Sequence, residues 1–280
     1  MNNLGFHCQR ISHIDTGILG NGLHRGEFYN FKVDELPALK KAIDSYGLDV
    51  SIHAPLVKPD WYPSPPTWTF LCDVAKDKRD LTLRMVRETL EIAAEYRAQY
   101  VVAHFPCPNT DATGESRSKL EAIAWRSAES LAELSVKHNI PVHIEGFGPS
   151  PFLAAEFLGQ VLTHFAPLRY CFDTGHMNLA AERDGIDLYA FAKAMAPFVG
   201  SVHLWNNRGI NDYRAYGHIP VHPAQKAEDG WVDVEKALRI LAGKKLSVPI
   251  IFENAHRYPG DLGNYDYRDG VKWVKELVAA

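Results

Sequence analysis

The chain has 280 residues, of which 46% are apolar and 23% are charged, a balance that is ordinary for a globular protein. Its formal net charge of −4 gives no electrostatic bias toward nucleic acid, whose binding proteins usually carry a basic patch. It shows no signal peptide and no apolar run of the roughly 20 residues that span a bilayer, and its four cysteines lack CxxC spacing. We therefore expect a cytoplasmic protein with buried thiols and no nucleic-acid or membrane partner.

Short apolar segments alternate along the chain with longer segments of helical period. Leu36, Leu39 and Ile43 illustrate the helical spacing, and Gly47 behind them suits a C-terminal cap. Two segments look irregular, since 58–70 holds four prolines and several aromatic residues and 207–230 is long and polar. We expect strands at 4–9, 26–31, 49–55, 100–106, 141–147, 169–174, 201–206 and 248–254. Further helices are expected near 83–93, 120–134, 152–165, 188–198, 234–241 and 271–277.

Eight strand candidates that mostly alternate with helices favour one closed parallel barrel, the (β/α)8 TIM barrel of the α/β class. Such barrels routinely reach this length as a single domain, and no linker or short internal repeat divides residues 1–280. A doubly wound open sheet is the alternative, but no G-x-G-x-x-G fingerprint follows the first expected strand.

Six of the expected strands carry an acidic or imidazole side chain at their carboxyl end, all in the same phase of the strand alternation. The carboxyl ends of the strands form the face on which TIM barrels place their active sites. Two positions earlier the residues are mostly small or apolar, as in the next layer of a packed barrel. We therefore expect the six to meet at one mouth: His53, His104, Glu145, Asp173, His203 and Glu253.

Three carboxylates and several imidazoles are costly to pack together unless a cation neutralises them. A divalent metal is therefore the expected cofactor, and mixed nitrogen and oxygen ligands suit Zn²⁺, Mn²⁺, Co²⁺ or Fe²⁺ better than Ca²⁺ or Mg²⁺ alone. Taken singly, each position has a plain structural interpretation, because a lone histidine at a strand end is more often a hydrogen-bonded core residue. Six positions in phase on six strands are much harder to explain by core packing.

Three more histidines lie close to the expected mouth. His176 follows the end of the sixth strand and could bind the metal or a substrate oxygen. His218 lies in the polar stretch and could complete the mouth, although a surface imidazole is an equally good interpretation. His143 precedes Glu145 by two residues, where we expect it to orient that carboxylate from one layer below.

With these residues in hand, the chain resembles the xylose-isomerase-like TIM barrels, a superfamily of sugar isomerases and epimerases that also contains endonuclease IV. The resemblance covers nearly the whole length. The segments that carry it are His53-Ala54-Pro55, His104-Phe105-Pro106, Ile144-Glu145-Gly146, Asp173-Thr174-Gly175-His176, His203-Leu204-Trp205-Asn206-Asn207 and Glu253-Asn254.

The resemblance implies one site in the ketose epimerases of this superfamily. There a single Mn²⁺ or similar ion is held by residues that match Glu145, Asp173, His203 and Glu253. The two glutamates also serve as the acid/base pair, and a histidine that matches His176 contacts the substrate.

Endonuclease IV implies a second, larger site. Its three-zinc cluster adds residues that match His53, His104, His176 and His218, together with one more aspartate. Tyr216 takes the place of that aspartate here, which puts a third zinc in doubt. Leu56 and Val57 also stand where endonuclease IV has the aromatic that it inserts into DNA.

Two functions follow. The first is a metal-dependent isomerase or epimerase of a sugar or sugar phosphate, in which the metal holds two adjacent oxygens of an enediolate while Glu145 and Glu253 move a proton between neighbouring carbons. The alternative is a zinc phosphoester hydrolase with two or three metals, which His53 and His104 favour and the acidic net charge opposes. A barrel that binds metal without turnover gains little support, because no member of the carboxylate set is missing.

The expected ligand is a small sugar-like molecule, covered by the aromatic segment 58–70 as a lid. That segment is equally well interpreted as a loop packed on the barrel rim. The oligomeric state is left open, with a homo-oligomer as one outcome. The residues expected to contact substrate are His176, His53, His104, Trp61, Trp68 and Arg208.

Overall fold

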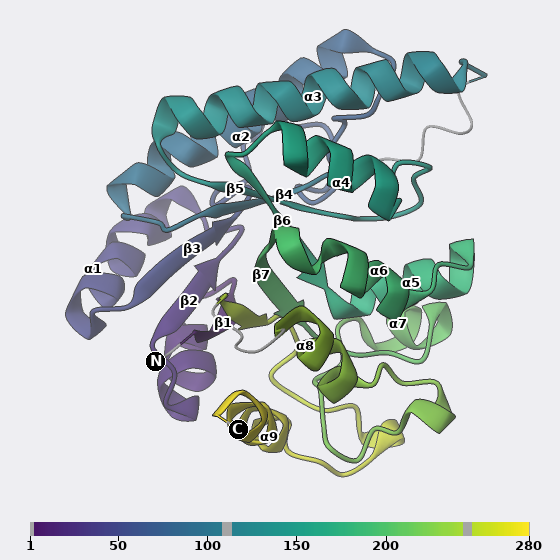
Figure 1. Cartoon of the computed structure of the whole chain (residues 1–280). Coiled ribbons are helices and arrows are strands. Elements are labelled where there is room, and N and C mark those ends of the chain that lie inside the picture. The colour runs from purple at the N-terminus through teal and green to yellow at the C-terminus, as the bar shows by residue number, and fades with distance from the viewer. Residues whose placement is uncertain (1–2, 108–113, 243–247, 280) are drawn as a thin grey trace.

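Eight parallel strands close into a barrel in sequence order, with β8 hydrogen-bonded back to β1 (Figure 1). The computed structural model describes residues 3–107, 114–242 and 248–279, so the ends and two internal segments of the expected 1–280 domain lie outside the described residues. The closed parallel barrel confirms the expected fold and excludes the open sheet. The strands are β1 (Leu4–Cys8), β2 (Arg25–Phe28), β3 (Asp49–His53), β4 (Val101–His104), β5 (Val142–Glu145), β6 (Leu168–Asp173), β7 (Val199–Leu204) and β8 (Ile250–Phe252).

Helices surround the barrel on its outside (Figure 1). The helices are α1 (Leu36–Tyr46), α2 (Lys76–Glu95), α3 (Arg117–His138), α4 (Ala155–His164), α5 (Thr174–Asp184), α6 (Leu188–Met195), α7 (Ile210–Tyr216), α8 (Val234–Ala242) and α9 (Tyr267–Ala279). A π-helical turn, Ile14–Ile18, and short 3-10 turns, among them Leu19–Asn21 and Val33–Glu35, fill connections between them.

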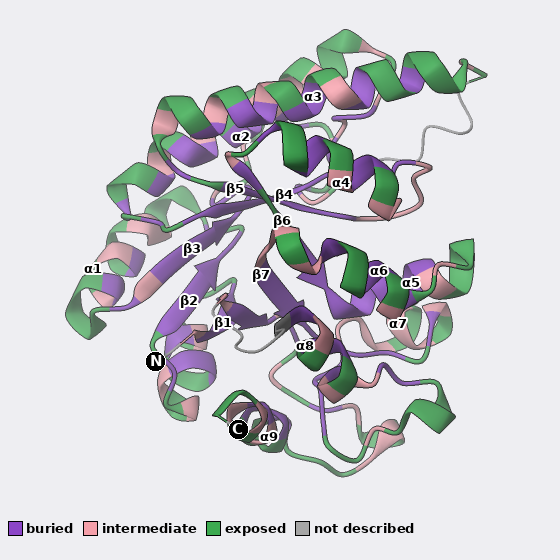
Figure 2. Ribbon diagram, viewed as in Figure 1, coloured by how far each residue is buried: buried purple, intermediate pink, exposed green. Residues whose placement is uncertain are grey.

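The main apolar core lies between the barrel and the helices. The strands are almost wholly buried, whereas the helices are exposed along their outer faces (Figure 2). Helix α1 shows how the sequence directs this packing, because Leu39 and Ile43 share its buried face. Gly47 then ends α1 in the left-handed conformation, with its N–H bonded to the carbonyl of Ile43, as the sequence predicts.

The inside of the barrel has a different composition. A small apolar cluster of Tyr100, Val102 and Cys171 lies there, separate from the main core. Around them lie buried polar side chains, and a bond of 2.9 Å joins His143 Nδ1 to Ser201 Oγ across the barrel. This interior therefore supplies hydrogen-bonding groups directly below the carboxyl ends of the strands.

Two helices differ from expectation. Helix α5 starts directly after β6, where no helix was expected from the sequence, and α7 lies within the stretch that was expected to be irregular. Gly175 allows close packing at the start of α5, since a Cβ at this position would lie 2.1 Å from Cε2 of Trp205. Within the described residues, no helix combines the length and the apolarity that crossing a membrane requires.

Candidate metal centre

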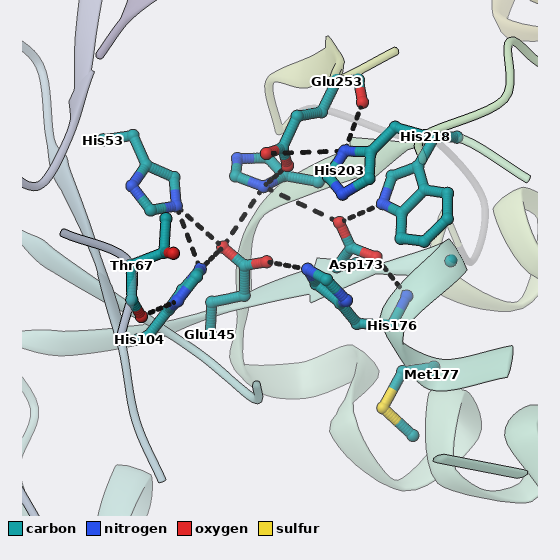
Figure 3. A network of polar contacts seen from close by, with 12 residues as sticks. His53, Thr67, His104, Glu145, Asp173, His176, Met177, His203, His218 and Glu253 are labelled. Carbon is teal, nitrogen blue, oxygen red and sulfur yellow. Dashed lines mark hydrogen bonds and ion pairs between the residues drawn. The ribbon is translucent and has the colours of Figure 1, made fainter. Parts of the chain in front are cut away.

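The register of the barrel brings the expected strand-end residues together. Asp173 on β6 pairs with His203 on β7, and His104 on β4 pairs with Glu145 on β5. Their side chains, with that of His53, are at most 3% exposed, and Glu253 immediately after β8 is 11% exposed. Figure 3 shows these side chains directed toward one another at the carboxyl ends of the strands.

Four of these residues form one compact donor set. Nδ1 of His203 lies 2.7 Å from Oε2 of Glu253, 3.3 Å from Oε2 of Glu145 and 3.9 Å from Oδ2 of Asp173. One ligand atom from each of the four residues can be chosen so that all lie within 4.8 Å of one another. Ligands that surround one transition-metal ion at about 2.0–2.2 Å lie no farther apart than this. The geometry therefore fits a single divalent cation.

The charges of this set also call for a cation. Burial and the neighbouring carboxylates of Glu145 and Glu253 raise the pKa of Asp173 well above its ordinary value. Burial alone would also raise the pKa of Glu145, but the imidazoles of His203 and His104 hold it well below its ordinary value. Both oxygens of Glu145 and Nδ1 of His203 are buried without a hydrogen-bond partner. Buried polar atoms of this kind are costly unless something binds them, and a divalent cation would do so.

A second donor set shares Glu145. Nε2 of His53 and Nε2 of His104 lie 3.2 Å apart, and both are 3.4–3.5 Å from Oε2 of Glu145. Nδ1 of His53 faces the carbonyl of Ala54 and Nδ1 of His104 faces that of Thr67, so in the neutral rings both Nε2 atoms are lone-pair acceptors. Donors at about 2.0–2.1 Å from a tetrahedral zinc are about 3.3 Å apart. This triangle therefore fits one face of a zinc site.

The position of Asp173 is fixed by two N–H donors. Its Oδ1 accepts from the backbone N–H of His176 at 2.5 Å, which caps the N-terminus of α5. Its Oδ2 accepts from Nε1 of Trp205 at 2.8 Å. The strand-to-helix junction and the indole thus hold the carboxylate toward the centre before any ion binds.

His176 and His218 line the outer side of the centre. Nε2 of His176 lies 3.8 Å from Oε1 of Glu145, and its ring centroid is 5.5 Å from that of His218. The ring of His218 stacks on Trp205 at 4.0 Å, and its Nδ1 faces the backbone carbonyl of Glu253 at 2.8 Å. The structure therefore brings both of these histidines to the mouth, where burial lowers the pKa of His176 to about 4.

Two cavities border residues of the centre. One, of about 570 Å³, is mostly apolar and is lined by His176, Trp68, Phe147 and Tyr213 among others. The other, of about 440 Å³, is more polar and includes Glu253, His218 and His7 in its wall. A small-molecule substrate could approach the metal-binding residues through either cavity.

The three remaining candidates for substrate contact fall in different places. Trp68 lies in the wall of the larger cavity, with its ring 5.9 Å from that of Phe147. Trp61 instead packs under the guanidinium of Arg84 on α2, at 4.1 Å. Arg208 is engaged by both carboxylate oxygens of Asp212, at 2.7 and 3.0 Å. Only Trp68 of these three is thus placed beside the centre.

One buried acidic residue, Glu27, was not predicted from the sequence, and His143 has a different partner from the one that was expected. Glu27, in β2, is fully buried, and its Oε1 lies 2.7 Å from Nε2 of His203. It escaped notice because it lies within its strand rather than at the end, although it shares the phase of His7 and Ser51 on the neighbouring strands. His143 was expected to orient Glu145, but its Nδ1 bonds Ser201 and its ring stacks on Tyr100 at 4.1 Å.

Fold and centre together define a (β/α)8 barrel with a buried cluster of metal-competent residues at the carboxyl ends of its strands. The family model of the xylose isomerase-like TIM barrel matches residues 15–277, and the chain belongs to this family. A search of curated protein sequences found no match.

Solved structures with the same fold include several that are described as sugar 3-epimerases or as similar to one. A D-tagatose 3-epimerase-like protein has a TM-score of 0.73 and 17% identity over 99% of this chain and 97% of its own. An L-ribulose 3-epimerase has a TM-score of 0.69 and 14% identity over 99% and 94% of the two chains. A Thermus thermophilus protein soaked with ZnCl2 has a TM-score of 0.62 and 19% identity over 100% and 98%. At these identities the likeness establishes the fold.

Proposed function

We propose that this protein is a divalent-metal-dependent epimerase or isomerase of a small sugar or sugar phosphate. The observation that carries the proposal is the arrangement of Glu145 and Glu253 around Nδ1 of His203. Membership of the xylose isomerase-like family and a fold shared with 3-epimerases support it. A bound cation would supply positive charge beside the substrate oxygens, where negative charge develops when a neighbouring carbon loses its proton.

The two glutamates are suited to move that proton. Each glutamate turns its Oε2 toward His203, so its Oε1 faces a histidine on the outer side of the centre. Oε1 of Glu145 lies 3.8 Å from Nε2 of His176. Oε1 of Glu253 lies 3.8 Å from Nδ1 of His218. One Oε1 takes a proton from a substrate carbon, and the other glutamate, in its acid form, returns a proton to the same or the next carbon. In a 3-epimerase both transfers occur at one carbon, from opposite faces.

The surrounding side chains would orient the sugar and limit access of water. His176 is positioned to hydrogen-bond a substrate hydroxyl, because its ring lies between the larger cavity and Glu145. Trp68 and Phe147 provide an apolar wall on the same side. Apolar walls around a few polar groups are typical of sites for small ligands.

A zinc phosphoester hydrolase remains the second candidate, favoured by the triangle of His53, His104 and Glu145. A mononuclear epimerase does not need this second donor set, whereas a dinuclear hydrolase does. The net charge of −4 and the presence of Tyr216 two residues before His218 oppose it. We therefore place the hydrolase second.

The two functions can be separated on the same preparation. Metal-free protein is reconstituted with Mn²⁺, Co²⁺ or Zn²⁺ and incubated in D2O with a panel of ketoses and ketose phosphates, and in parallel with DNA that contains an abasic site. The epimerase proposal predicts metal-dependent deuterium incorporation at the carbon next to the carbonyl, with formation of the epimer. Cleavage of the DNA by a form with two or three zinc ions, without exchange in any sugar, would overturn it.

A further inference from the structure

Glu27 is a buried carboxylate that has no role in the proposed reaction. It is the third residue of β2, in register with His7 on β1 and Ser51 on β3, and it has no exposed surface. None of the metal-competent groups found among the described residues includes it. Burying a carboxylate is costly unless hydrogen bonds or an opposite charge compensate, so its partners indicate its role.

Both oxygens of Glu27 have a partner inside the barrel. The hydroxyl of Ser51 donates to Oε2 at 3.1 Å, and Oε1 lies 2.7 Å from Nε2 of His203. The short contact to the imidazole therefore links the interior layer of β2 and β3 to the donor set at the mouth. An ionised carboxylate can only accept hydrogen bonds, so the proton in this contact belongs to Nε2 of His203.

The two nitrogens of His203 face different groups. Nε2 faces Glu27, while Nδ1 faces Oε2 of Glu253 at 2.7 Å and Oε2 of Glu145 at 3.3 Å. A neutral imidazole carries one N–H, and a nitrogen must be free of its proton to bind a metal. With the proton on Nε2, the lone pair of Nδ1 is directed at the carboxylates of the metal centre.

We propose that Glu27 is a positioning residue for the metal centre. By accepting the hydrogen bond from Nε2–H of His203, it holds the ring in the orientation and tautomer in which Nδ1 is a ligand. This inference rests on the proposed metal centre and adds β2 to a set otherwise supplied by β5, β6, β7 and the residue after β8. A carboxylate behind a ligating histidine also makes the other ring nitrogen more basic, and its loss typically lowers metal affinity about 10- to 100-fold.

The test compares Glu27→Gln and Glu27→Leu with the unchanged chain. Gln keeps the size and a neutral acceptor, whereas Leu removes both the charge and the acceptor. The dissociation constant of the metal-free protein for Zn²⁺ and for Mn²⁺ is measured by competition with a chelating dye. We expect Kd to rise about 10-fold for Gln and about 100-fold for Leu, with the number of bound ions unchanged.

Ser135→Ala is the matched control for loss of a buried hydrogen bond. Ser135 lies on the outer helix α3, and its hydroxyl donates to the carbonyl of Ile140 at 2.8 Å. We expect this variant to melt at a lower temperature and to keep the Kd of the unchanged chain. Melting curves of all metal-free variants are recorded beside the titrations, and Glu27→Gln decides the test if Glu27→Leu does not fold.

An unchanged Kd in folded Glu27→Gln and Glu27→Leu would overturn the role of Glu27 while leaving the metal centre intact. An equal rise of Kd in Ser135→Ala would also overturn it, because the effect would then be one of general stability. If the unchanged chain bound no ion, the metal centre would fall and this inference with it. In the zinc-loaded protein a long-range ¹H–¹⁵N spectrum is expected to place the proton on Nε2 of His203, and a proton on Nδ1 would contradict the proposal.

Discussion

His203 is the residue at which the buried charges of the barrel converge. Its side chain is fully buried, and four carboxylates surround its two nitrogens at 2.7 to 3.9 Å. Burial alone would lower the pKa of His203, but Cys171 and the carboxylates of Glu27, Glu145 and Glu253 raise it well above its ordinary value. A proton on the ring and a cation at Nδ1 are thus alternative ways to neutralise the same carboxylates.

The amide variant Glu253→Gln tests whether Glu253 belongs to the proposed acid/base pair. Glutamine cannot take up a proton and is a weaker metal ligand, so we expect turnover to fall by about 10²- to 10⁴-fold, the usual contribution of a general acid or base. The variant is assayed with its metal content measured, so that loss of the ion and loss of the base are distinguished.

Glu235→Gln is the control for Glu253→Gln. Glu235 is a half-buried residue of α8 that pairs with Arg239 at 2.6 Å, and its variant is expected to retain full turnover. A Glu253→Gln enzyme as active as this control would remove Glu253 from the catalytic pair.

Residues at strand ends could be predicted from the sequence, whereas residues inside strands could not. Alternation along a strand and the common direction of parallel strands suffice to bring Asp173 and His203 to one mouth. Glu27 gives no such signal, because it lies within β2 and is followed by the aromatic residues Phe28 and Tyr29. Its role depends on the side chain that crosses the barrel interior to meet it, and this contact is a property of the closed structure.

Among the elements, the junction of β6 and α5 positions the centre most directly. Asp173 ends the strand and caps the helix, and the ring of Trp205 packs against Gly175 in the first turn. The glycine therefore controls how closely the indole, and with it the Nε1–H that Asp173 accepts, can approach. From the sequence, the sixth strand was expected to end at residue 174, and no helix was expected over 174–184.

Adding one methyl group at this junction should disturb both packing and the centre. In Gly175→Ala the new Cβ would lie 2.1 Å from Cε2 of Trp205, so the indole must move. We expect the free energy of unfolding to fall by about 1–3 kcal/mol, the usual cost of overpacking a core, and metal affinity to fall with it. Denaturant unfolding and the dye competition measure the two effects.

Gly159→Ala provides the matched comparison. Gly159 lies within α4, where a Cβ would meet Cε2 of Phe198 at an ordinary 3.7 Å. The variant should be neutral or more stable by up to about 1 kcal/mol, because alanine favours the helix. Equal destabilisation of the two variants would show that the contact with Trp205 has no special cost.

Helix α7 was not predicted because its sequence is polar and short. Its seven residues, Ile210–Tyr216, contain no fully buried side chain, so no apolar period marks it. It is supported by contacts across the fold, since the backbone N–H of Ile210 bonds Oε2 of Glu182 on α5 at 2.6 Å. Such a helix depends on its neighbours more than on its own sequence.

For the molecule as a whole, the order of segments was enough to predict the barrel. Eight apolar segments separated by helical ones leave few alternatives for a chain of this length, and the closed order β1 to β8 confirms the prediction. The order of segments does not predict which polar side chains meet inside the barrel. The polar layer below the mouth comes from which side chains meet across the barrel.

The four cysteines test this packing over the whole molecule. All are buried and free, and burial raises the pKa of Cys107 and Cys171 to about 12 and those of Cys8 and Cys72 further. Because the thiolate is the reactive form, the native protein should react very slowly with a disulfide reagent at pH 8. In denatured protein, all four thiols should react rapidly with the reagent. Fast labelling of the native protein would contradict the buried positions of the cysteines.

Anomalous X-ray diffraction can locate a metal ion at the mouth of the barrel. Crystals grown with Mn²⁺ or Zn²⁺ are measured on both sides of the absorption edge of the metal. We predict an anomalous peak within ligand distance of Glu145, Asp173, His203 and Glu253. No peak there at saturating metal, with the four side chains paired only to one another, would contradict it.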